Sequence, residues 1–227
     1  MACLDKKVWI ECLDNRYGKH ETVYDAGSCT TGIHILLEEI GAVFEAYLVN
    51  LLEGDHKQPD YMAMNPKSTI PLLVREDGKA ITEFQAIAYW LARRFPKAKL
   101  LPEDLDSEAR VMETMDYVVG TIHMQGFARL FTTSEFCETE GEQEAIKAKG
   151  KEIINKGFGV INKYLQEKTK DKPYVAGDYS IADAALFYVE FWADKIGIPL
   201  PEYCQQHYQR MRERPAVQQV LLEEGYR

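Results

Sequence analysis

The chain contains 227 residues, of which 46% are hydrophobic, 28% charged and 11% aromatic, and its formal net charge is −9. This mixture is ordinary for a globular protein and excludes a disordered or fibrous chain. The acidity favours solubility and argues against a surface that follows nucleic-acid phosphates, so no nucleic-acid partner is expected. Since no apolar run reaches the length of a bilayer and the first residues lack a secretory signal, no membrane partner is expected either.

The cysteines indicate a reducing compartment. They are odd in number, widely scattered and without a Cys-x-x-Cys pair, at Cys3, Cys12, Cys29, Cys137 and Cys204. A disulfide framework needs an even, dense set, and a zinc site needs paired ligands at short spacing. None of the histidines has the spacing of a metal-binding motif. We therefore expect a cytoplasmic protein that binds no metal.

The first half of the chain alternates between strand and helix patterns. The expected order is strand, helix, strand, then two strands and a helix, at residues 21–24, 30–40, 43–51, 70–74, 79–82 and 84–94. Asp77-Gly78 separates the fourth and fifth of these elements and is a strong hairpin signal. A β-α-β unit followed by β-β-α predicts a small mixed sheet with helices packed on it.

From Ser107 onward only helical periodicity is seen. Apolar stripes run through residues 111–122 and 146–165, and residues 180–196 are apolar nearly all round, which predicts the buried centre of a bundle. A segment bracketed by two prolines, 95–102, separates the halves. The expected organisation is an extension, a first domain, a linker and an all-helical domain, at residues 1–19, 20–95, 96–106 and 107–227. Residues 6–13 in the extension have strand propensity.

Cys29 is the first candidate for chemistry. It lies between an expected strand and the start of an expected helix, where unpaired backbone N–H groups and the helix dipole favour a thiolate. The thiolate is the nucleophilic form of cysteine. The other interpretation is that Cys29 is a small buried hydrophobic residue, as most free cysteines are. The sequence leaves both interpretations open.

Two further candidates lie near the expected hairpin. A cis bond between Ile70 and Pro71 would present the Ile70 backbone to a peptide-like ligand, whereas Pro71 is otherwise a tolerated edge residue. Glu83 ends a strand just before the helix that starts at Phe84. The N–H groups of that helix start could hold a carboxylate while Glu83 holds an ammonium group. Alternatively, Glu83 only complements the helix dipole.

The second half contains one candidate for chemistry and one structural signal. His123 lies on the long helix after the linker, where a lone histidine is more often a packing residue than a catalyst. Ser180 and Asp183 have the spacing of a capping box, which would nucleate the buried helix.

Together these pieces resemble a soluble glutathione transferase, closest to the bacterial beta class, from about residue 20 to the C-terminus. The resemblance is carried by Ala26-Gly27-Ser28-Cys29-Thr30 with His34, by the stretches 65–71, 77–87 and 179–184, and by 214–218 with Glu224-Gly225. The order and spacing of these stretches are specific, although each is weak alone.

The resemblance implies a thioredoxin-like N-terminal domain that binds glutathione, an all-helical C-terminal domain and a homodimer. The glutathione-binding residues it implies are Cys29, Thr30, Ile70, Pro71, Glu83, Phe84 and Asp116. Cys29 and His123 match the catalytic cysteine and the histidine near the glutathione sulfur. Glutathione is then a co-substrate, with no metal cofactor.

Four features depart from the beta-class pattern. Phe84 stands where that class has glycine and many others have serine, so only backbone N–H groups can bind the ligand carboxylate there. Asp116 stands about where the beta class has asparagine. The stretch after His123 is one residue longer than usual, and some nineteen residues precede the first family strand.

The leading hypothesis is transfer of glutathione to a hydrophobic electrophile held between the domains. The helix start near Cys29 and Thr30, with His123, would stabilise the thiolate. Four apolar residues of the long helix could form the wall that contacts the electrophile, although at helical spacing they are otherwise ordinary core residues: Met124, Phe127, Leu130 and Phe131. One alternative is monothiol exchange through a mixed disulfide at Cys29. Another is a non-catalytic module that binds apolar ligands.

Overall fold

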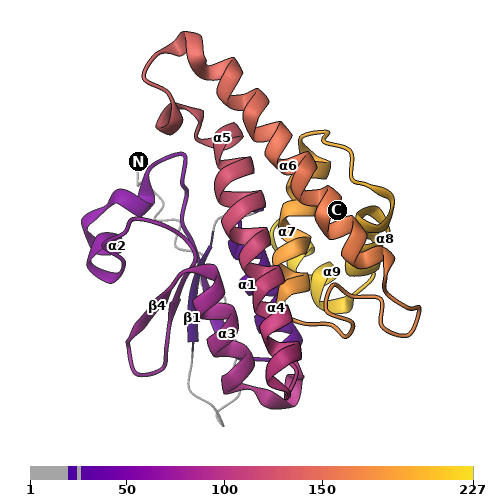
Figure 1. The fold of residues 1–227 in the computed structure, drawn as a ribbon. Helices are drawn as coiled ribbons and strands as arrows, with labels where there is room; N and C mark the ends of the chain where they lie inside the picture. The colour runs from indigo at the N-terminus through magenta and orange to yellow at the C-terminus, as the bar shows by residue number, and fades with distance from the viewer. Residues whose placement is uncertain (1–19, 25–26, 227) are drawn as a thin grey trace. The chain divides into compact units, whose positions relative to one another are not determined.

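The computed structural model describes residues 20–24 and 27–226 (Figure 1). The expected extension, with its strand-prone residues 6–13, lies outside the described part of the chain. Two compact units are present: one runs up to Ala98 and resumes at Pro215, and the other is Lys99–Arg214.

The sheet of the first unit has four strands in the order β2-β1-β3-β4. Strand β1 (His20–Tyr24) pairs in parallel with β2 (Phe44–Leu48) and antiparallel with β3 (Leu72–Val74), which pairs antiparallel with β4 (Ala80–Thr82). Helix α1 (Thr30–Ile40) connects the two parallel strands. The expected β-α-β unit and β-β hairpin are therefore both confirmed.

Strand β2 is shorter than the expected strand over 43–51. Its end is set by Asn50, whose side-chain oxygen accepts hydrogen bonds from the N–H groups of Leu52 and Glu53 at 3.0 and 3.1 Å. Such a local side-chain turn gives the backbone an alternative to the sheet ladder. The apolar residues after Leu48 therefore lie in a turn instead of extending the strand.

Helices α1 and α3 (Phe84–Arg94) pack against each other through their apolar faces. In α1 the residues at helical spacing, Ile33, Leu36 and Leu37, are completely buried. Gly41 ends α1 in the left-handed conformation at φ 65°, where glycine carries no Cβ penalty. The shorter elements of this unit are a 3-10 turn at Asp55–Lys57, α2 at Pro59–Met64 and a 3-10 turn at Pro96–Ala98.

Helix α9 (Pro215–Glu223) belongs to the first unit because it packs against α1. The sequence pattern had placed everything after residue 107 in the helical domain. An amphipathic helix shows which of its faces is buried, but not which neighbour covers that face, so this assignment required the tertiary structure.

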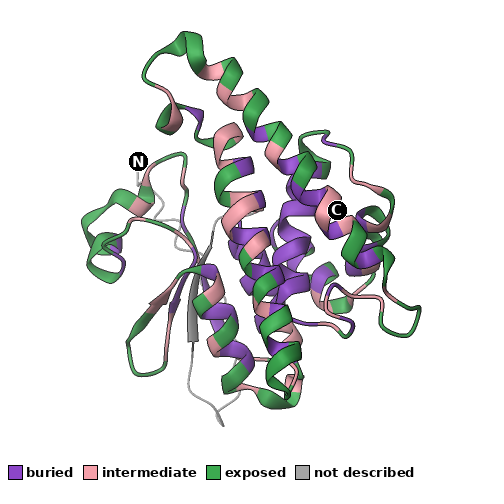
Figure 2. Cartoon of the chain, in the orientation of Figure 1, coloured by how far each residue is buried: buried purple, intermediate pink, exposed green. Residues whose placement is uncertain are grey.

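The second unit is built from helices. They are α4 (Leu105–Tyr117), a π-helix (Val118–Phe127), α5 (Ala128–Phe131), 3-10 turns at Thr133–Phe136 and Glu140–Glu142, α6 (Gln143–Gln166), α7 (Ile181–Lys195) and α8 (Glu202–Arg212). Every residue from Ile181 to Ala193 is buried (Figure 2). Helix α7 is thus the central helix that the sequence predicts, with α4, the π-helix and α8 packed against it.

The start of α7 carries the expected capping box. One carboxylate oxygen of Asp183 accepts hydrogen bonds from the backbone N–H and the hydroxyl of Ser180, at 2.8 and 2.9 Å. The other oxygen accepts from the N–H of Val175 at 2.9 Å and lies 3.2 Å from Nε2 of His207. Since the second ring nitrogen of His207 lies 2.8 Å from Glu190, the cap is also part of a buried polar network that joins α7 to α8.

Within the described residues, no helix combines the length and apolar character needed to cross a membrane.

Candidate active site

Cys29 occupies the N-cap position of α1. Its side chain is nearly buried, and its thiol donates a hydrogen bond to the carbonyl oxygen of Ile70, with 3.7 Å between sulfur and oxygen. A hydrogen bond that the S–H group donates stabilises the neutral thiol relative to the thiolate. This contact therefore places the Cys29 sulfur next to the Ile70 backbone.

The backbone N–H groups at the start of α1 are engaged locally. The N–H of Thr30 donates to the hydroxyl of Ser28 at 3.2 Å. The N–H groups of Thr31 and Gly32 donate to the carbonyl oxygens of Ser28 and Cys29, each at 3.2 Å. The expectation that the Cys29 thiol faces unpaired N–H groups is wrong for these three, because the tight turn before the helix already supplies their acceptors.

The side chain of Thr30 is completely buried beside Cys29. Its hydroxyl oxygen has no hydrogen-bond partner among the described residues. A buried polar atom without a partner costs about 1–3 kcal/mol and calls for an explanation.

The segment from Asn65 to Pro71 is held by its own hydrogen bonds. The carbonyl oxygen of Thr69 accepts from the hydroxyl of Tyr61 at 2.6 Å and from the side-chain amide of Asn65 at 2.7 Å. The bond between Ile70 and Pro71 is cis, which is the isomer that would present the Ile70 backbone to a ligand.

Glu83 lies directly after β4, with a backbone φ of 73°. Non-glycine residues seldom adopt this left-handed conformation, and it clusters at ligand-binding sites. The Glu83 carboxylate is exposed and lies 2.6 Å from Nζ of Lys67, which also donates to the hydroxyl of Thr82 at 2.8 Å. Because Lys67 and Ile70 belong to one segment, residues 65–71 contact both Glu83 and Cys29.

The start of α3, immediately after Glu83, differs from the start of α1. The N–H groups of Gln85 and Ala86 donate no hydrogen bond within the described residues, and the first bond of the turn is the one from Ile87 to the carbonyl of Glu83. The ring of Phe84 is buried, so this residue can offer a ligand only its backbone. Open N–H groups at the positive end of a helix form a site for a carboxylate.

Glu224 supports the Cys29 turn from the C-terminal end of the chain. Its side chain is fully buried, and its Oε2 accepts hydrogen bonds from the N–H of Gly27 at 2.9 Å and the hydroxyl of Thr31 at 2.8 Å. Oε1 lies 3.4 Å from Nδ1 of His34. In the sequence Glu224 stands out only as part of the family resemblance; its function as a buried acceptor is visible only in three dimensions.

His34 carries a positive charge in this network. Burial by itself would lower its pKa, but hydrogen bonds to Glu223 and Glu224 outweigh that effect and raise the pKa to about 9. His34, Glu38 and Glu223 also form the group of described residues whose atoms could reach one metal ion, all within 4.8 Å. Since the imidazole is protonated at neutral pH and each ring nitrogen faces a carboxylate, the group is better explained as an ion-pair network.

His123 lies in the π-helix of the second unit. Its Nδ1 is 3.1 Å from the hydroxyl of Tyr188, and the rings of Tyr188 and Trp192 pack edge-on against the imidazole, which is half-buried. Burial lowers the pKa of His123 to about 4, so the imidazole is neutral at pH 7.

Asp116, on α4, is exposed. The apolar residues considered for the electrophile wall differ among themselves. Met124 and Phe131 are about half exposed, at 54% and 50%, whereas Phe127 is fully buried and packs in an edge-on contact against Trp192. Phe127 is therefore an ordinary core residue of the second unit, as the alternative to the electrophile wall predicts.

Comparisons with known proteins identify the family to which the chain belongs. The family model described as the N-terminal domain of glutathione S-transferase matches residues 26–94. The chain is 34% identical over 214 residues to glutathione S-transferase GstA of Escherichia coli O157:H7, covering 89% of this chain and 97% of that protein.

Solved structures give the same result for the fold. A glutathione transferase homologue from Sulfitobacter with bound glutathione superimposes with a TM-score of 0.82 at 26% identity, covering 90% of this chain and 98% of that one. A beta-class enzyme from Sphingomonas chungbukensis gives 0.76 at 26% identity over 90% and 98% of the two chains. The thioredoxin-like unit and the helical unit are those of these proteins, and the chain belongs to the glutathione S-transferase family of enzymes.

Proposed function

We propose that the protein binds reduced glutathione on its first unit and conjugates the glutathione sulfur to hydrophobic electrophiles. The observation that carries this proposal is the open start of α3 beside Glu83, because it offers matched partners for the two charged groups of an amino acid. The Sulfitobacter homologue, which was solved with bound glutathione, supports the choice of ligand.

In the proposed binding mode, the γ-glutamyl carboxylate accepts hydrogen bonds from the N–H groups of Gln85 and Ala86. The ammonium group pairs with Glu83, whose carboxylate is accessible because its present partner, Lys67, is an exposed lysine. Exposed ion pairs of this kind contribute only about 0–1 kcal/mol, so exchanging Lys67 for the ligand costs little. Phe84 takes part through its backbone alone.

The cysteinyl part of glutathione would pair with the backbone of Ile70, next to Pro71. This arrangement places the ligand sulfur near Cys29 and Thr30, since the Cys29 thiol contacts the Ile70 carbonyl. The positive end of the α1 dipole at Cys29 and Thr30 is suited to stabilise a sulfur anion there. Lowering a thiol pKa from about 8.5 to 7 corresponds to about 2 kcal/mol of thiolate stabilisation, which is within the range of one charge-assisted hydrogen bond.

The nucleophile in this proposal is the glutathione sulfur, not Cys29. The Cys29 thiol donates to the Ile70 carbonyl, which favours its protonated form. The family resemblance assigns a catalytic role to His123 and a contact with the γ-glutamyl group to Asp116. With its pKa lowered to about 4, His123 would act as a neutral hydrogen-bonding group.

The test compares Cys29→Ser and Glu83→Gln with a control, Glu53→Gln, which removes an exposed carboxylate elsewhere in the first unit. Glutathione affinity is measured by calorimetry. Conjugation activity is measured separately, with a chlorodinitrobenzene as the electrophile. We expect Glu83→Gln to weaken glutathione binding about tenfold and the control to leave it unchanged. Cys29→Ser should keep most of the conjugation activity. Complete loss of that activity would indicate that Cys29 is the nucleophile and would favour the thiol–disulfide exchange alternative.

The same family resemblance supports a cytoplasmic homodimer. Light scattering coupled to size-exclusion chromatography tests the assembly, and a mass near twice 26.0 kDa is expected.

A further inference from the structure

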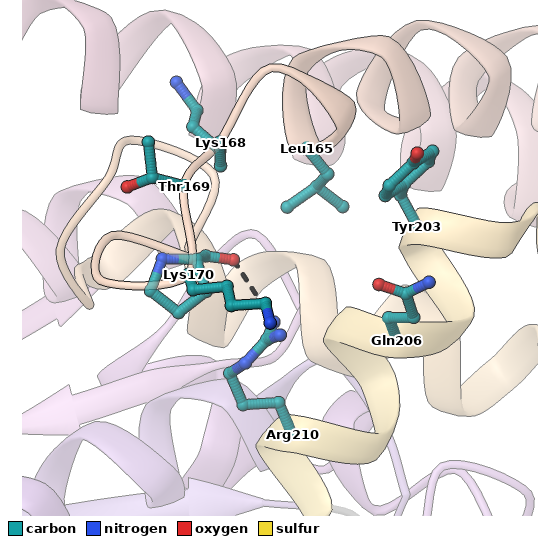
Figure 3. Close-up of a pocket in the computed structure, with 8 residues that line it drawn as sticks. Leu165, Lys168, Thr169, Lys170, Tyr203, Gln206 and Arg210 are labelled. Carbon is teal, nitrogen blue, oxygen red and sulfur yellow. Dashed lines mark hydrogen bonds between the residues drawn. The ribbon is translucent and has the colours of Figure 1, made fainter.

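A cavity of about 200 Å³ lies within the second unit, where the end of α6, the loop after it and α8 meet. Three of its eight lining residues are cationic, Lys168, Lys170 and Arg210, and none is acidic. Figure 3 shows the loop residues on one side of the cavity and Tyr203 and Gln206 of α8 on the other. Such a concentration of positive charge is unexpected in a chain with a net charge of −9.

The two cavity lysines differ from the lysine that follows them. Lys172 pairs with Asp178 at 2.9 Å and does not line the cavity. Lys168 and Lys170 make no ion pair with any described residue. Because neither lysine has an ion-pair partner among the described residues, both ammonium groups are available to an external acceptor. A bound anion would also reduce the repulsion between the like charges that line the cavity.

The guanidinium of Arg210 is positioned by two contacts, with Pro173 and Tyr174. One guanidinium nitrogen donates to the carbonyl oxygen of Pro173 at 3.2 Å, and the guanidinium carbon lies 6.0 Å from the ring centre of Tyr174. An arginine carries five N–H donors in a rigid fork, and this carbonyl is its one hydrogen-bond acceptor among the described residues. A positioned guanidinium with free donors is suited to bind phosphate or carboxylate oxygens in a bidentate manner.

The remaining walls are partly apolar. Leu165 is 6% exposed, and Pro173 and Tyr203 also line the cavity, with the backbone N–H of Tyr203 fixed by the side chain of Asn162 at 2.8 Å. Thr169 and Gln206 add neutral hydrogen-bonding groups. A ligand with a compact anionic end and a small flat organic group matches these walls. The volume is below the range of pockets for drug-sized ligands, which limits the ligand to a small molecule.

We propose that this cavity is an accessory binding site for a small phosphate monoester. Its phosphate would lie between Lys170 and Arg210, whose side chains approach each other in Figure 3, with Lys168 at the rim of the cavity, and its organic group would lie against Leu165 and Tyr203. Phosphate fits better than a carboxylate because its three terminal oxygens and double charge match more than one cation. The site is built within the second unit and is independent of glutathione binding.

The test titrates phenyl phosphate into the full-length protein, saturated with glutathione so that the first unit is occupied, and follows binding by calorimetry at low and at physiological salt. We expect the Lys168→Ala/Lys170→Ala double variant and Arg210→Ala each to weaken binding at least tenfold. Lys172→Ala, which removes a cation outside the cavity lining, should change it less than twofold. Inorganic phosphate should bind more weakly than phenyl phosphate because it lacks the organic group.

Three results would overturn the proposal: no binding of phenyl phosphate, equal weakening in Lys172→Ala, or full affinity in both cavity variants. Equal weakening would indicate diffuse attraction to surface charge. The lysine double variant replaces side chains that make no ion pair with a described residue, so its folding is expected to persist even if Arg210→Ala disturbs the loop. An unchanged circular dichroism spectrum and melting temperature verify that each variant is folded, and because neither measurement involves glutathione, they separate this test from the proposed function.

Discussion

Glu224 accepts a hydrogen bond from the backbone N–H of Gly27 at 2.9 Å, across 197 positions of sequence. The same carboxylate oxygen accepts from the hydroxyl of Thr31 at 2.8 Å. Gly27 and Thr31 lie on either side of Cys29, so one buried carboxylate near the C-terminus supports both ends of the turn that presents the thiol. The C-terminal residues are therefore structural parts of the first unit.

Replacing Glu224 should be strongly destabilising. Glu224→Ala leaves the charged His34 and two donors without their buried acceptor, and breaking a buried charge pair in this way costs about 3–5 kcal/mol. Urea unfolding monitored by circular dichroism measures the loss. Glu223→Gln is the matched control: its side chain is 25% exposed and it pairs with the same histidine, so the loss should be smaller. Equal losses for the two variants would show that Glu224 has no special supporting function.

The network around His34 predicts a loss of stability in mild alkali. The pKa of His34 is about 9 in the folded protein against 6.5 for the unperturbed group. Because the folded pKa is the higher one, its contribution is complete below about pH 6.5 and disappears as the pH rises through 9, for a total of roughly 3 kcal/mol. The free energy of unfolding, measured from pH 6 to 10, should fall over this window.

His207, with its pKa also raised to about 9, contributes in the same direction. The His34→Gln variant separates the two histidines, since it removes only one of them. The difference in unfolding free energy between wild type and His34→Gln should be largest near pH 6 and smallest near pH 9.5. A difference that does not change with pH would mean that His34 is not charged in the folded protein.

A side chain at Gly27 should disturb the Cys29 turn. Gly27 has φ 71°, and a Cβ atom there would collide with the hydroxyl of Tyr226. Gly41 is the control, because it has nearly the same φ, 65°, and no atom lies within 4 Å of the place that an alanine methyl group would take. Gly41→Ala should cost only the left-handed backbone penalty of about 1–2 kcal/mol. Gly27→Ala should cost more and should also lower conjugation activity.

Tyr226→Phe offers a second check on the Gly27 prediction. Removing the hydroxyl relieves the closest contact, so the Gly27→Ala/Tyr226→Phe double variant should regain part of the melting temperature that Gly27→Ala loses. If the double variant is no more stable than Gly27→Ala, the collision is not the cause of the loss.

His123 should stay neutral throughout the physiological range. Burial lowers its pKa to about 4, so its ring resonances in an NMR titration should not shift between pH 5.5 and 8.5. Conjugation activity should show no change attributable to this group over the same range, and His123→Ala should lower kcat if the neutral ring contributes a hydrogen bond. A His123 midpoint near pH 6.5 would contradict the inferred burial.

Local sequence patterns predict the order and type of most helices and strands, because periodicity and turn chemistry are local properties. The helix from Thr30 to Ile40 and the hairpin at Asp77-Gly78 were predicted with their observed bounds or close to them. The capping box at Ser180 and Asp183 was predicted for the same reason. Strand β2 was predicted too long, since apolar character continued past the point where Asn50 turns the backbone.

Which backbone groups already have hydrogen-bond partners, and which are open to a ligand, is visible only in three dimensions. The N–H groups at the start of α1 have acceptors in Ser28 and Cys29, whereas those of Gln85 and Ala86 have none among the described residues. From the sequence the two helix starts looked alike. The pairing of Glu224 with Gly27 and the cations around the cavity by α8 were equally invisible, because contacts between distant segments depend on packing, which no local pattern encodes.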